Sequence, residues 1–285
     1  MKVNLNSSTQ KTPSNLGTVY CCATPIGSLS DCSQTLLNVL SHCDLIAAED
    51  TRVAQKLLSQ LSISKPCIRV DAHTESTAIS KLLPKLEDGQ NIALLSDAGT
   101  LNICDPGAEL CRQLHEKGIP LIPVVGPSSL AGFLSVCGIR ADRFYFGGFF
   151  PRSHQDTHSL PIISTGTLCI FFESPKRILK TAQFLKTLPI DSFFAIKEMS
   201  KSHESYWTDL DSLCKDLDDP SRQKGEWVFG FTCKESQASS DDQCIELVKT
   251  LKEKGFSLKD TVYITTQLMD FAKNTVYDAY HHSDA

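Results

Sequence analysis

The chain has 285 residues, of which 41% are hydrophobic and 21% charged, and its formal net charge is −5 at pH 7. This length favours two domains, and this composition is typical of a globular protein with sizeable cores. A mildly acidic chain is not a general nucleic-acid binder, so a contact with RNA requires a local basic patch.

Targeting signals and disulfides are not expected in this chain. Residues 1–16 are polar, without the apolar run of a signal peptide, and we expect a disordered tail. No apolar run reaches membrane-spanning length. The twelve cysteines are scattered, without a Cys-x-x-Cys pair or a histidine at zinc-ligand spacing. We therefore expect reduced core thiols, no metal, no membrane and a cytoplasmic location.

The region 17–126 alternates short apolar segments with amphipathic ones. Strands are expected at 18–23, 44–48, 67–70, 92–95 and 119–125. Because strands that alternate with helices form βαβ units, this region predicts a parallel, doubly wound, Rossmann-like sheet. The region lacks both the G-x-G-x-x-G fingerprint and a P-loop, so the usual pyrophosphate cradle is not expected.

Polar residues ahead of the helical segments predict where the helices begin. Ser30 or Asp31 is expected to cap the first helix, and Asp50 the second. Asp105, followed by a proline at the first helical position, is expected to cap the fourth. Pro84 lies within the third helical segment and predicts a kink or an early end.

Three loops that follow strands share Gly or Pro residues: Pro25-Ile26-Gly27, Asp97-Ala98-Gly99 and Gly126-Pro127-Ser128. The carboxyl ends of parallel strands meet at one edge of a sheet, which is where open α/β sheets bind ligands. Asp97 is expected to face the crevice, and Gly99 to let the backbone approach a bulky group. A plain strand–loop–helix connection explains each loop taken singly, but the convergence of three loops indicates a binding site.

Charged side chains cluster just after two of the predicted strands. Glu49, Asp50 and Arg52 follow the second strand, and His73 follows the third. The acidic pair also suits a helix N-terminus, and a lone loop histidine also suits an ordinary surface position, so both interpretations stay open.

The region 127–238 differs in composition from the first region and predicts a second α/β domain with a mixed sheet. Residues 143–152 are aromatic and glycine-rich, and strands are expected at 167–172, 193–196 and 226–233.

The region 239–285 predicts a small helical extension. It contains an amphipathic helix at 241–254, a second helix through Met269 that opens with the capping-box spacing of residues 257–260, and a short helix at 274–280.

Short motifs in this order resemble the ribosomal RNA small subunit methyltransferase I family, within the class III, tetrapyrrole-methylase-like group of S-adenosylmethionine (SAM) enzymes. The resemblance spans residues 17–280. Its motifs are Ala23-Thr24-Pro25-Ile26-Gly27, Ala48-Glu49-Asp50-Thr51-Arg52, Ser96-Asp97-Ala98-Gly99-Thr100, Asp105-Pro106-Gly107, Gly126-Pro127-Ser128, Gly148-Phe149-Phe150-Pro151-Arg152, Glu173-Ser174-Pro175 with Arg177, and Gly225-Glu226.

The resemblance implies two α/β domains with SAM in the cleft between them. It implies 2′-O-methylation of a decoding-centre cytidine in 16S rRNA of the small ribosomal subunit, by a cytoplasmic homodimer. It also implies that the helical extension is helix-turn-helix-like and a possible RNA contact.

The resemblance also assigns roles to residues. The SAM contacts that it implies are Pro25, Ile26, Gly27, Asp97, Gly99, Thr100, Ser128, Ser129, Phe172 and Gly225. A ribose hydroxyl needs a base to become a good nucleophile. The candidates for that base or for a substrate orienter are Glu49, Asp50, His73, Glu173, Glu198 and Glu226. The candidates for phosphate contacts are Arg52, Arg152, Lys176 and Arg177, the last two of which also suit a solvated helix start.

The chain departs from the family pattern at Ser28, Leu101 and Cys104 and in the loop that holds His73, which bears on substrate positioning. Three other functions are weighed against the main one. The first is a same-fold methyltransferase acting on a tetrapyrrole or a protein side chain. The second is a non-catalytic SAM- or RNA-binding assembly factor. The third is an α/β protein that binds another nucleotide.

Overall fold

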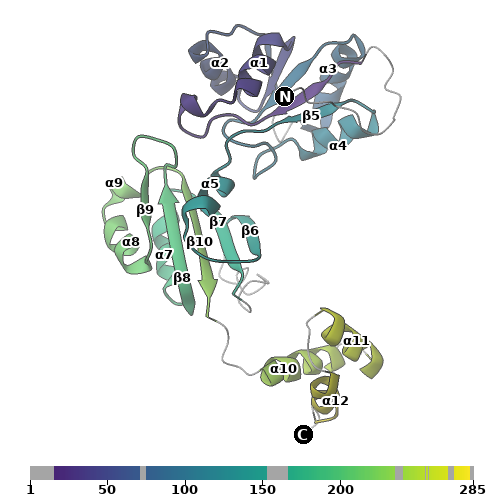
Figure 1. The fold of residues 1–285 in the computed structure, drawn as a ribbon, viewed down its shortest axis with the longest axis vertical. Helices are drawn as coiled ribbons and strands as arrows, with labels where there is room; N and C mark the ends of the chain where they lie inside the picture. The colour runs from purple at the N-terminus through teal and green to yellow at the C-terminus, as the bar shows by residue number, and fades with distance from the viewer. Residues whose placement is uncertain are drawn as a thin grey trace, which may run out of the picture. The chain divides into compact units, whose positions relative to one another are not determined.

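The computed structural model describes residues 16–70, 75–152, 166–234, 240–253, 255, 257–268 and 273–282. The described residues form two compact units that divide near Cys233. Figure 1 shows two sheets in the first unit and the helices α10, α11 and α12 in the second. His73 and the tail expected at the N-terminus, up to residue 15, lie outside the described residues.

The first sheet is parallel, as predicted. Its strands are β1 (Val19–Cys22), β2 (Leu45–Ala48), β3 (Cys67–Arg69), β4 (Ile92–Leu95) and β5 (Leu121–Val124). They lie in the order β3-β2-β4-β1-β5, and each pairing is parallel. The loop after β4, which begins at Ser96, therefore opens at the middle of the sheet's carboxyl edge.

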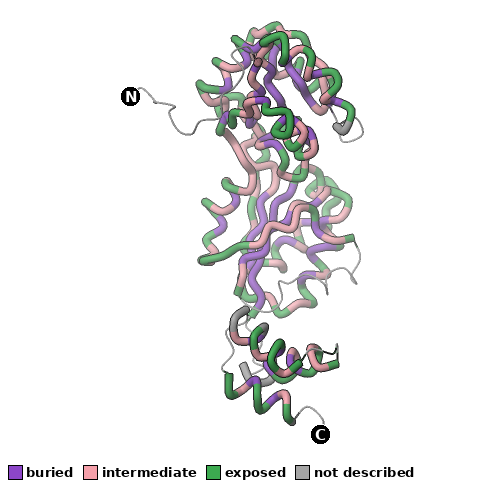
Figure 2. The backbone as a smooth tube through the Cα atoms, turned by 90° about the vertical axis from the view of Figure 1, so that its right-hand side faces the viewer, coloured by how far each residue is buried: buried purple, intermediate pink, exposed green. Residues whose placement is uncertain are grey.

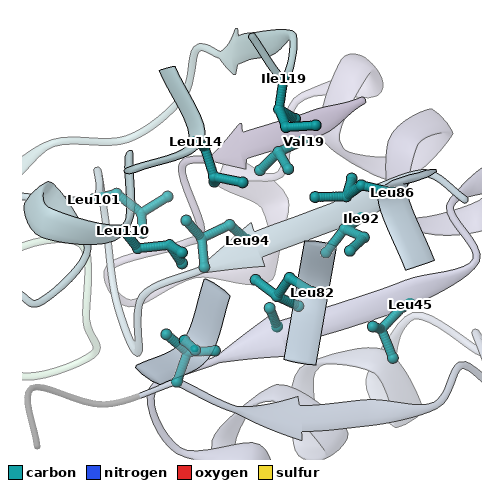
Figure 3. Packing of buried hydrophobic residues seen from close by; sticks show 13 residues of the cluster. Val19, Leu45, Leu82, Leu86, Ile92, Leu94, Leu101, Leu110, Leu114 and Ile119 are labelled. Atoms are coloured by element: carbon teal, nitrogen blue, oxygen red, sulfur yellow. The ribbon is translucent and has the colours of Figure 1, made fainter. Parts of the chain in front are cut away.

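Helices cover both faces of this sheet. They are α1 (Gln34–His42), α2 (Thr51–Gln60), α3 (Glu75–Glu87) and α4 (Ala108–Glu116), with a short 3-10 helix η1 (Leu29–Asp31). Because side chains alternate along a strand, Ile92 and Leu94 of β4 pack against α3 and α4, as Figure 3 shows, while Ala93 and Leu95 face α1 and α2. Every residue of β4 is buried, which explains the uninterrupted apolar run in the sequence.

The second sheet is mixed, as predicted. Its strands are β6 (Phe144–Phe149), β7 (Leu168–Glu173), β8 (Ile190–Lys197), β9 (Ser205–Trp207) and β10 (Trp227–Cys233), in the order β6-β7-β10-β8-β9. β6 pairs with β7 in parallel, whereas β7 pairs with β10 and β8 with β9 antiparallel. The helices of this half are α5 (Ser129–Val136), α7 (Ile178–Leu185), α8 (Leu210–Leu217) and α9 (Pro220–Gln223). Figure 2 shows the inner strands buried and the outer faces of the helices exposed.

The second unit consists of α10 (Ser240–Glu253), α11 (Leu258–Leu268) and α12 (Lys273–His282). Its small core contains Cys244 and Val248 of α10 and Val276 and Ala279 of α12. Ser257 caps α11, as its spacing predicted, because its Oγ accepts a hydrogen bond from the Asp260 N–H over 3.2 Å.

Two of the predicted helix caps are wrong. Ser33, rather than Ser30 or Asp31, caps α1, and its Oγ accepts the Leu36 N–H over 3.1 Å. Residues 29–31 form η1 instead. Helix α4 begins at Ala108 after Gly107, which has a φ of 135° and provides no side-chain cap. Asp105 does not cap α4, because the backbone turns between it and the helix and its carboxyl group lies at a different site, described below.

Other features differ from expectation for reasons of packing. Helix α3 does not end early at Pro84 but continues to Glu87, because Leu82 and Leu86 are buried on both sides of the proline. The strand β9 was not predicted, since three residues at a sheet edge give no periodic signal. None of the twelve cysteines, all of which lie among the described residues, forms a disulfide.

Candidate functional site

The turns after β1, β4 and β5 are hydrogen-bonded to one another at the carboxyl edge of the first sheet. Thr24 and Gly99 exchange two backbone hydrogen bonds, of 2.9 and 3.1 Å. The Thr100 hydroxyl donates to the Pro127 carbonyl over 3.0 Å. The three loops singled out in the sequence therefore form one continuous rim.

The turn after β2 joins this rim through Asp97. The backbone N–H of Asp50 donates to Asp97 Oδ1 over 3.1 Å. Asp50 itself caps α2, as predicted, by accepting the Arg52 N–H over 2.8 Å, and it pairs with the Arg52 guanidinium at 2.6 Å. The hydrogen bonds from the Arg52 side chain and backbone lower the pKa of Asp50 to about 2. The Asp50 carboxylate is thus already bound to the backbone at the start of α2 and to the Arg52 side chain.

A cavity of about 250 Å³ opens beside the rim, and both α/β halves of the first unit line it. Its lining residues are Ile26, Asp97, Ala98, Gly99, Thr100, Ile103, Cys104, Asp105, Ser128, Ser129, Phe149, Phe172, Glu173, Ile196, Met199, Glu226, Trp227 and Val228. Apolar walls with a few convergent polar groups are typical of a small-molecule site.

Two aspartates give the cavity a negative end. The pKa of Asp105 is raised to about 6, mainly by burial and secondly by the charge of Asp97. A hydrogen bond with the Ser96 hydroxyl opposes this rise. Such a pair of carboxyl groups favours a cationic ligand, because a nearby positive charge offsets their mutual repulsion.

The loop that carries Asp105 has an unusual backbone. Asn102 and Cys104 have φ values of 65° and 67°, in the left-handed region that non-glycine residues rarely occupy. Burial and, to a lesser extent, the charge of Asp105 raise the pKa of the Cys104 thiol. A hydrogen bond with the Phe149 backbone opposes this rise. Backbone strain of this kind is concentrated at functional sites.

Glu173, at the end of β7, is 2% exposed and its carboxylate is fully engaged. Its Oε1 accepts the Ser174 N–H over 2.7 Å and the Arg177 Nε–H over 2.8 Å, and its Oε2 accepts the Thr181 hydroxyl over 2.6 Å. Arg177 also donates to the Phe150 carbonyl over 2.7 Å. The pair therefore ties β7 to α7 and to the end of β6.

The turn after β8 brings the second α/β half to the cavity and packs beside Gly27 of the rim. Lys201 Nζ bridges Glu198 Oε1 at 3.0 Å and Glu226 Oε2 at 2.9 Å, and Glu198 also accepts the Glu226 N–H. Burial raises the pKa of Glu198, but the Glu226 N–H and Lys201 outweigh it, so the net shift is downward. Met199, between these charged residues, lines the cavity.

The residues assigned to SAM from the sequence fall mostly in this cavity. Those that line it are Ile26, Asp97, Gly99, Thr100, Ser128, Ser129 and Phe172. Pro25, Gly27 and Gly225 are not lining residues, although each is next in the chain to one that is.

The candidate bases are more dispersed. Glu173 and Glu226 line the cavity, whereas Glu49, Asp50 and Glu198 do not. Of the candidates for RNA contact, Arg152 and Lys176 are exposed and the Arg52 side chain is 88% exposed, while Arg177 is turned inward to Glu173.

Sequence reasoning missed about half of the lining. The missed residues include Ile103, Phe149, Ile196, Met199 and the start of β10. Apolar residues at strand ends gave no signal that separates a cavity wall from a core. Asp105 did carry a signal, a second carboxylate in the loop of Asp97, but it was interpreted only as a helix cap.

Within the described ranges, no three His, Cys, Asp or Glu side chains group as a metal site would require. The helices in those ranges are also too short or too polar to cross a bilayer.

The family model of Tetrapyrrole (Corrin/Porphyrin) Methylases matches residues 18–214. The ribosomal RNA small subunit methyltransferase I of Haemophilus influenzae is 36% identical over 269 residues, which cover 92% of this chain and 95% of that protein. The protein of the same name from Escherichia coli O157:H7 is 33% identical over 277 residues, or 94% and 96% of the two chains.

Two solved structures share the fold over about three quarters of the chain. Uroporphyrin-III-C-methyltransferase from Thermus thermophilus aligns with a TM-score of 0.55 and 17% identity over 76% of this chain and 94% of that one. A diphthine synthase aligns with a TM-score of 0.58 and 12% identity over 76% and 90%.

Two α/β domains around a shared cavity define a SAM-dependent methyltransferase of the tetrapyrrole methylase class. The relatives match nearly the whole chain at 33–36% identity, so the chain belongs to the ribosomal RNA small subunit methyltransferase I family.

Proposed function

We propose that this protein transfers a methyl group from SAM to the 2′-oxygen of a cytidine ribose in 16S rRNA of the small ribosomal subunit. The observation that carries the proposal is the cavity. Three turns at strand ends and the carboxyl groups of Asp97 and Asp105 line it from the first α/β domain, and apolar side chains line it from the second. The substrate class follows from the small-subunit rRNA methyltransferases that match almost the whole chain.

The cavity suits SAM chemically. SAM is amphiphilic, with a flat adenine, an ammonium group and a sulfonium that supplies the methyl group. The apolar lining, such as Ile26, Phe172 and Val228, suits the adenine, and Asp97 suits a positive charge. Ser128 and Ser129, at the start of α5, offer hydroxyl and N–H groups to the polar parts.

The protein's main contribution to methyl transfer is alignment of the acceptor oxygen with the methyl carbon. For RNA, the exposed cations Arg52, Arg152 and Lys176 are proposed phosphate contacts, which position a nucleic acid without reading its sequence. Arg177 is a weaker candidate for this role because its guanidinium is engaged by Glu173 and Phe150.

We also propose that the protein acts as a cytoplasmic homodimer. Light scattering coupled to size-exclusion chromatography tests the dimer, and an elution mass of one chain contradicts it.

The function is tested with labelled SAM and small ribosomal subunits from cells that lack this protein. We expect one methyl group per subunit, recovered as 2′-O-methylcytidine after digestion and mass spectrometry. Label on a base, on a ribosomal protein or on a tetrapyrrole contradicts the proposal. SAM that fails to raise the melting temperature argues for a different ligand.

A further inference from the structure

A methyltransferase that acts on a ribose hydroxyl needs a group to receive the hydroxyl proton, and the carboxylates around the cavity differ in their availability for this role. Glu173 is neutralised by Arg177 and also accepts two further hydrogen bonds. Glu226 pairs with Lys201 at 2.9 Å. Both carboxylates are therefore already engaged by a cation of the protein, and Glu173 by further donors as well.

Asp97 and Asp105 are the remaining acidic residues of the lining. Asp97 accepts the Asp50 N–H and belongs to the rim assigned to the methyl donor. Asp105 lies six residues beyond Gly99, in the strained loop. It has a hydrogen bond with the Ser96 hydroxyl, but no ion pair reaches it within the described residues. Its neighbour Cys104 is held at a φ of 67°, against β6 of the second domain.

We propose that Asp105 is the catalytic base, which accepts the proton of the ribose 2′-hydroxyl during methyl transfer. This inference rests on the proposed function. The 2′-oxygen forms the new O–CH3 bond as the S–CH3 bond breaks, the electron pair of that bond stays on sulfur, and the proton passes to the Asp105 carboxylate. The products are the 2′-O-methyl ribose, a neutral thioether and a protonated Asp105.

The electrostatics suit this role. A base works best when its pKa lies near the working pH, and the pKa of Asp105 is about 6. The titratable groups beside it are Asp97 and the Cys104 thiol. The second α/β half adds Glu173 and Glu226 to the same lining, with their partners Arg177 and Lys201. Of these, Asp97 is the one whose charge raises the pKa of Asp105.

The test is a single-turnover methylation assay with SAM at saturation and an excess of protein over small ribosomal subunits. In Asp105→Asn the rate of methyl transfer should fall about 100-fold or more, the range typical of a lost general base. The Kd of SAM, measured by calorimetry, should rise by less than about tenfold, because Asp97 remains at the rim. Asp105→Glu should recover part of the rate, because it restores a carboxylate.

The pH dependence provides a second measurement on the unaltered protein. Its single-turnover rate should rise as the pH increases from about 5 to 7 and then level off, whereas the residual rate of Asp105→Asn should lack this rise. A matched control is Asp88→Asn, which removes an exposed carboxylate between α3 and β4. Asp88 is not a lining residue and precedes β4, whereas the lining loop follows β4, so this variant should change neither rate nor Kd.

The other outcomes have definite meanings. A rate of Asp105→Asn within threefold of wild type overturns the inference, and so does a wild-type rate that is flat between pH 5 and 7. A SAM Kd raised tenfold or more, with a normal rate at saturation, also overturns it and makes Asp105 a donor-binding residue. Wild-type protein that transfers no methyl group to the subunits overturns the proposed function itself, and the inference with it.

Discussion

The backbone N–H of Asp50 donates a hydrogen bond to Oδ1 of Asp97 over 3.1 Å, which links the chain after β2 to the chain after β4. These two strands are neighbours in the sheet, so the bond closes the rim on the side opposite to the Thr24–Gly99 bridge. The bond holds Oδ1 of Asp97 in place, while the exposed Asp97 side chain still lines the cavity.

Removal of the Asp97 side chain should abolish SAM binding. Asp97→Ala loses both the negative charge and the acceptor for the Asp50 N–H, and we expect no measurable heat of binding by calorimetry. Asp97→Asn keeps an acceptor of the same shape and loses only the charge, so it should bind SAM with a weakened but measurable affinity. Unchanged affinity in Asp97→Ala would contradict the placement of SAM at this rim.

Arg177 should matter for stability more than for RNA. Arg177→Ala leaves the carboxylate of Glu173 buried without its charged partner, and we expect a loss of about 3 kcal/mol in the free energy of unfolding, measured in urea. The adjacent Lys176→Ala removes an exposed cation and should change the unfolding free energy by less than about 0.5 kcal/mol. If the two variants are equally stable, the interior role of Arg177 is wrong.

Gly99 and Gly118 offer a matched pair of substitutions. Their φ values are 78° and 69°, so alanine carries a similar backbone cost at both, of about 1 kcal/mol. A Cβ at Gly99 would lie 3.1 Å from Ile26 Cγ2 in the rim, whereas a Cβ at Gly118 meets nothing within 4 Å. Both variants should therefore melt at lower temperature, but only Gly99→Ala should weaken SAM binding. Equal SAM affinities would show that the Gly99 turn does not contact the ligand.

Asp105→Asn should stabilise the folded protein at neutral pH. The pKa of Asp105 is about 6 when folded and near its usual 3.8 when unfolded, so the unfolded state ionises first. The folded state therefore loses stability as the pH rises from about 4 through 6, and an amide at this position removes that loss. We expect a higher melting temperature for Asp105→Asn than for wild type at pH 7.5, and a smaller difference at pH 4.5. A variant that melts lower than wild type at pH 7.5 would contradict the raised pKa.

The sequence alone determined the two α/β halves and the order of the first five strands along the chain. This was possible because burial leaves a local pattern of apolar residues in the sequence. β4 is buried on both faces and appears as a continuous apolar run, and the strands alternate with amphipathic helices. The rim was also predictable, since carboxyl ends of parallel strands share one edge and turns there need Gly, Pro or Asp.

Only the tertiary structure decided which charged groups are available for chemistry. The Glu173 carboxylate accepts hydrogen bonds from Arg177 and Thr181, at the start of and within α7. Asp105, whose position in the sequence suggested a helix cap, lines the cavity instead. The physical reason is that burial and hydrogen-bond partners arise from segments distant in the chain, and these set both the charge state and the exposure of a side chain. A residue type and its spacing carry no record of those partners.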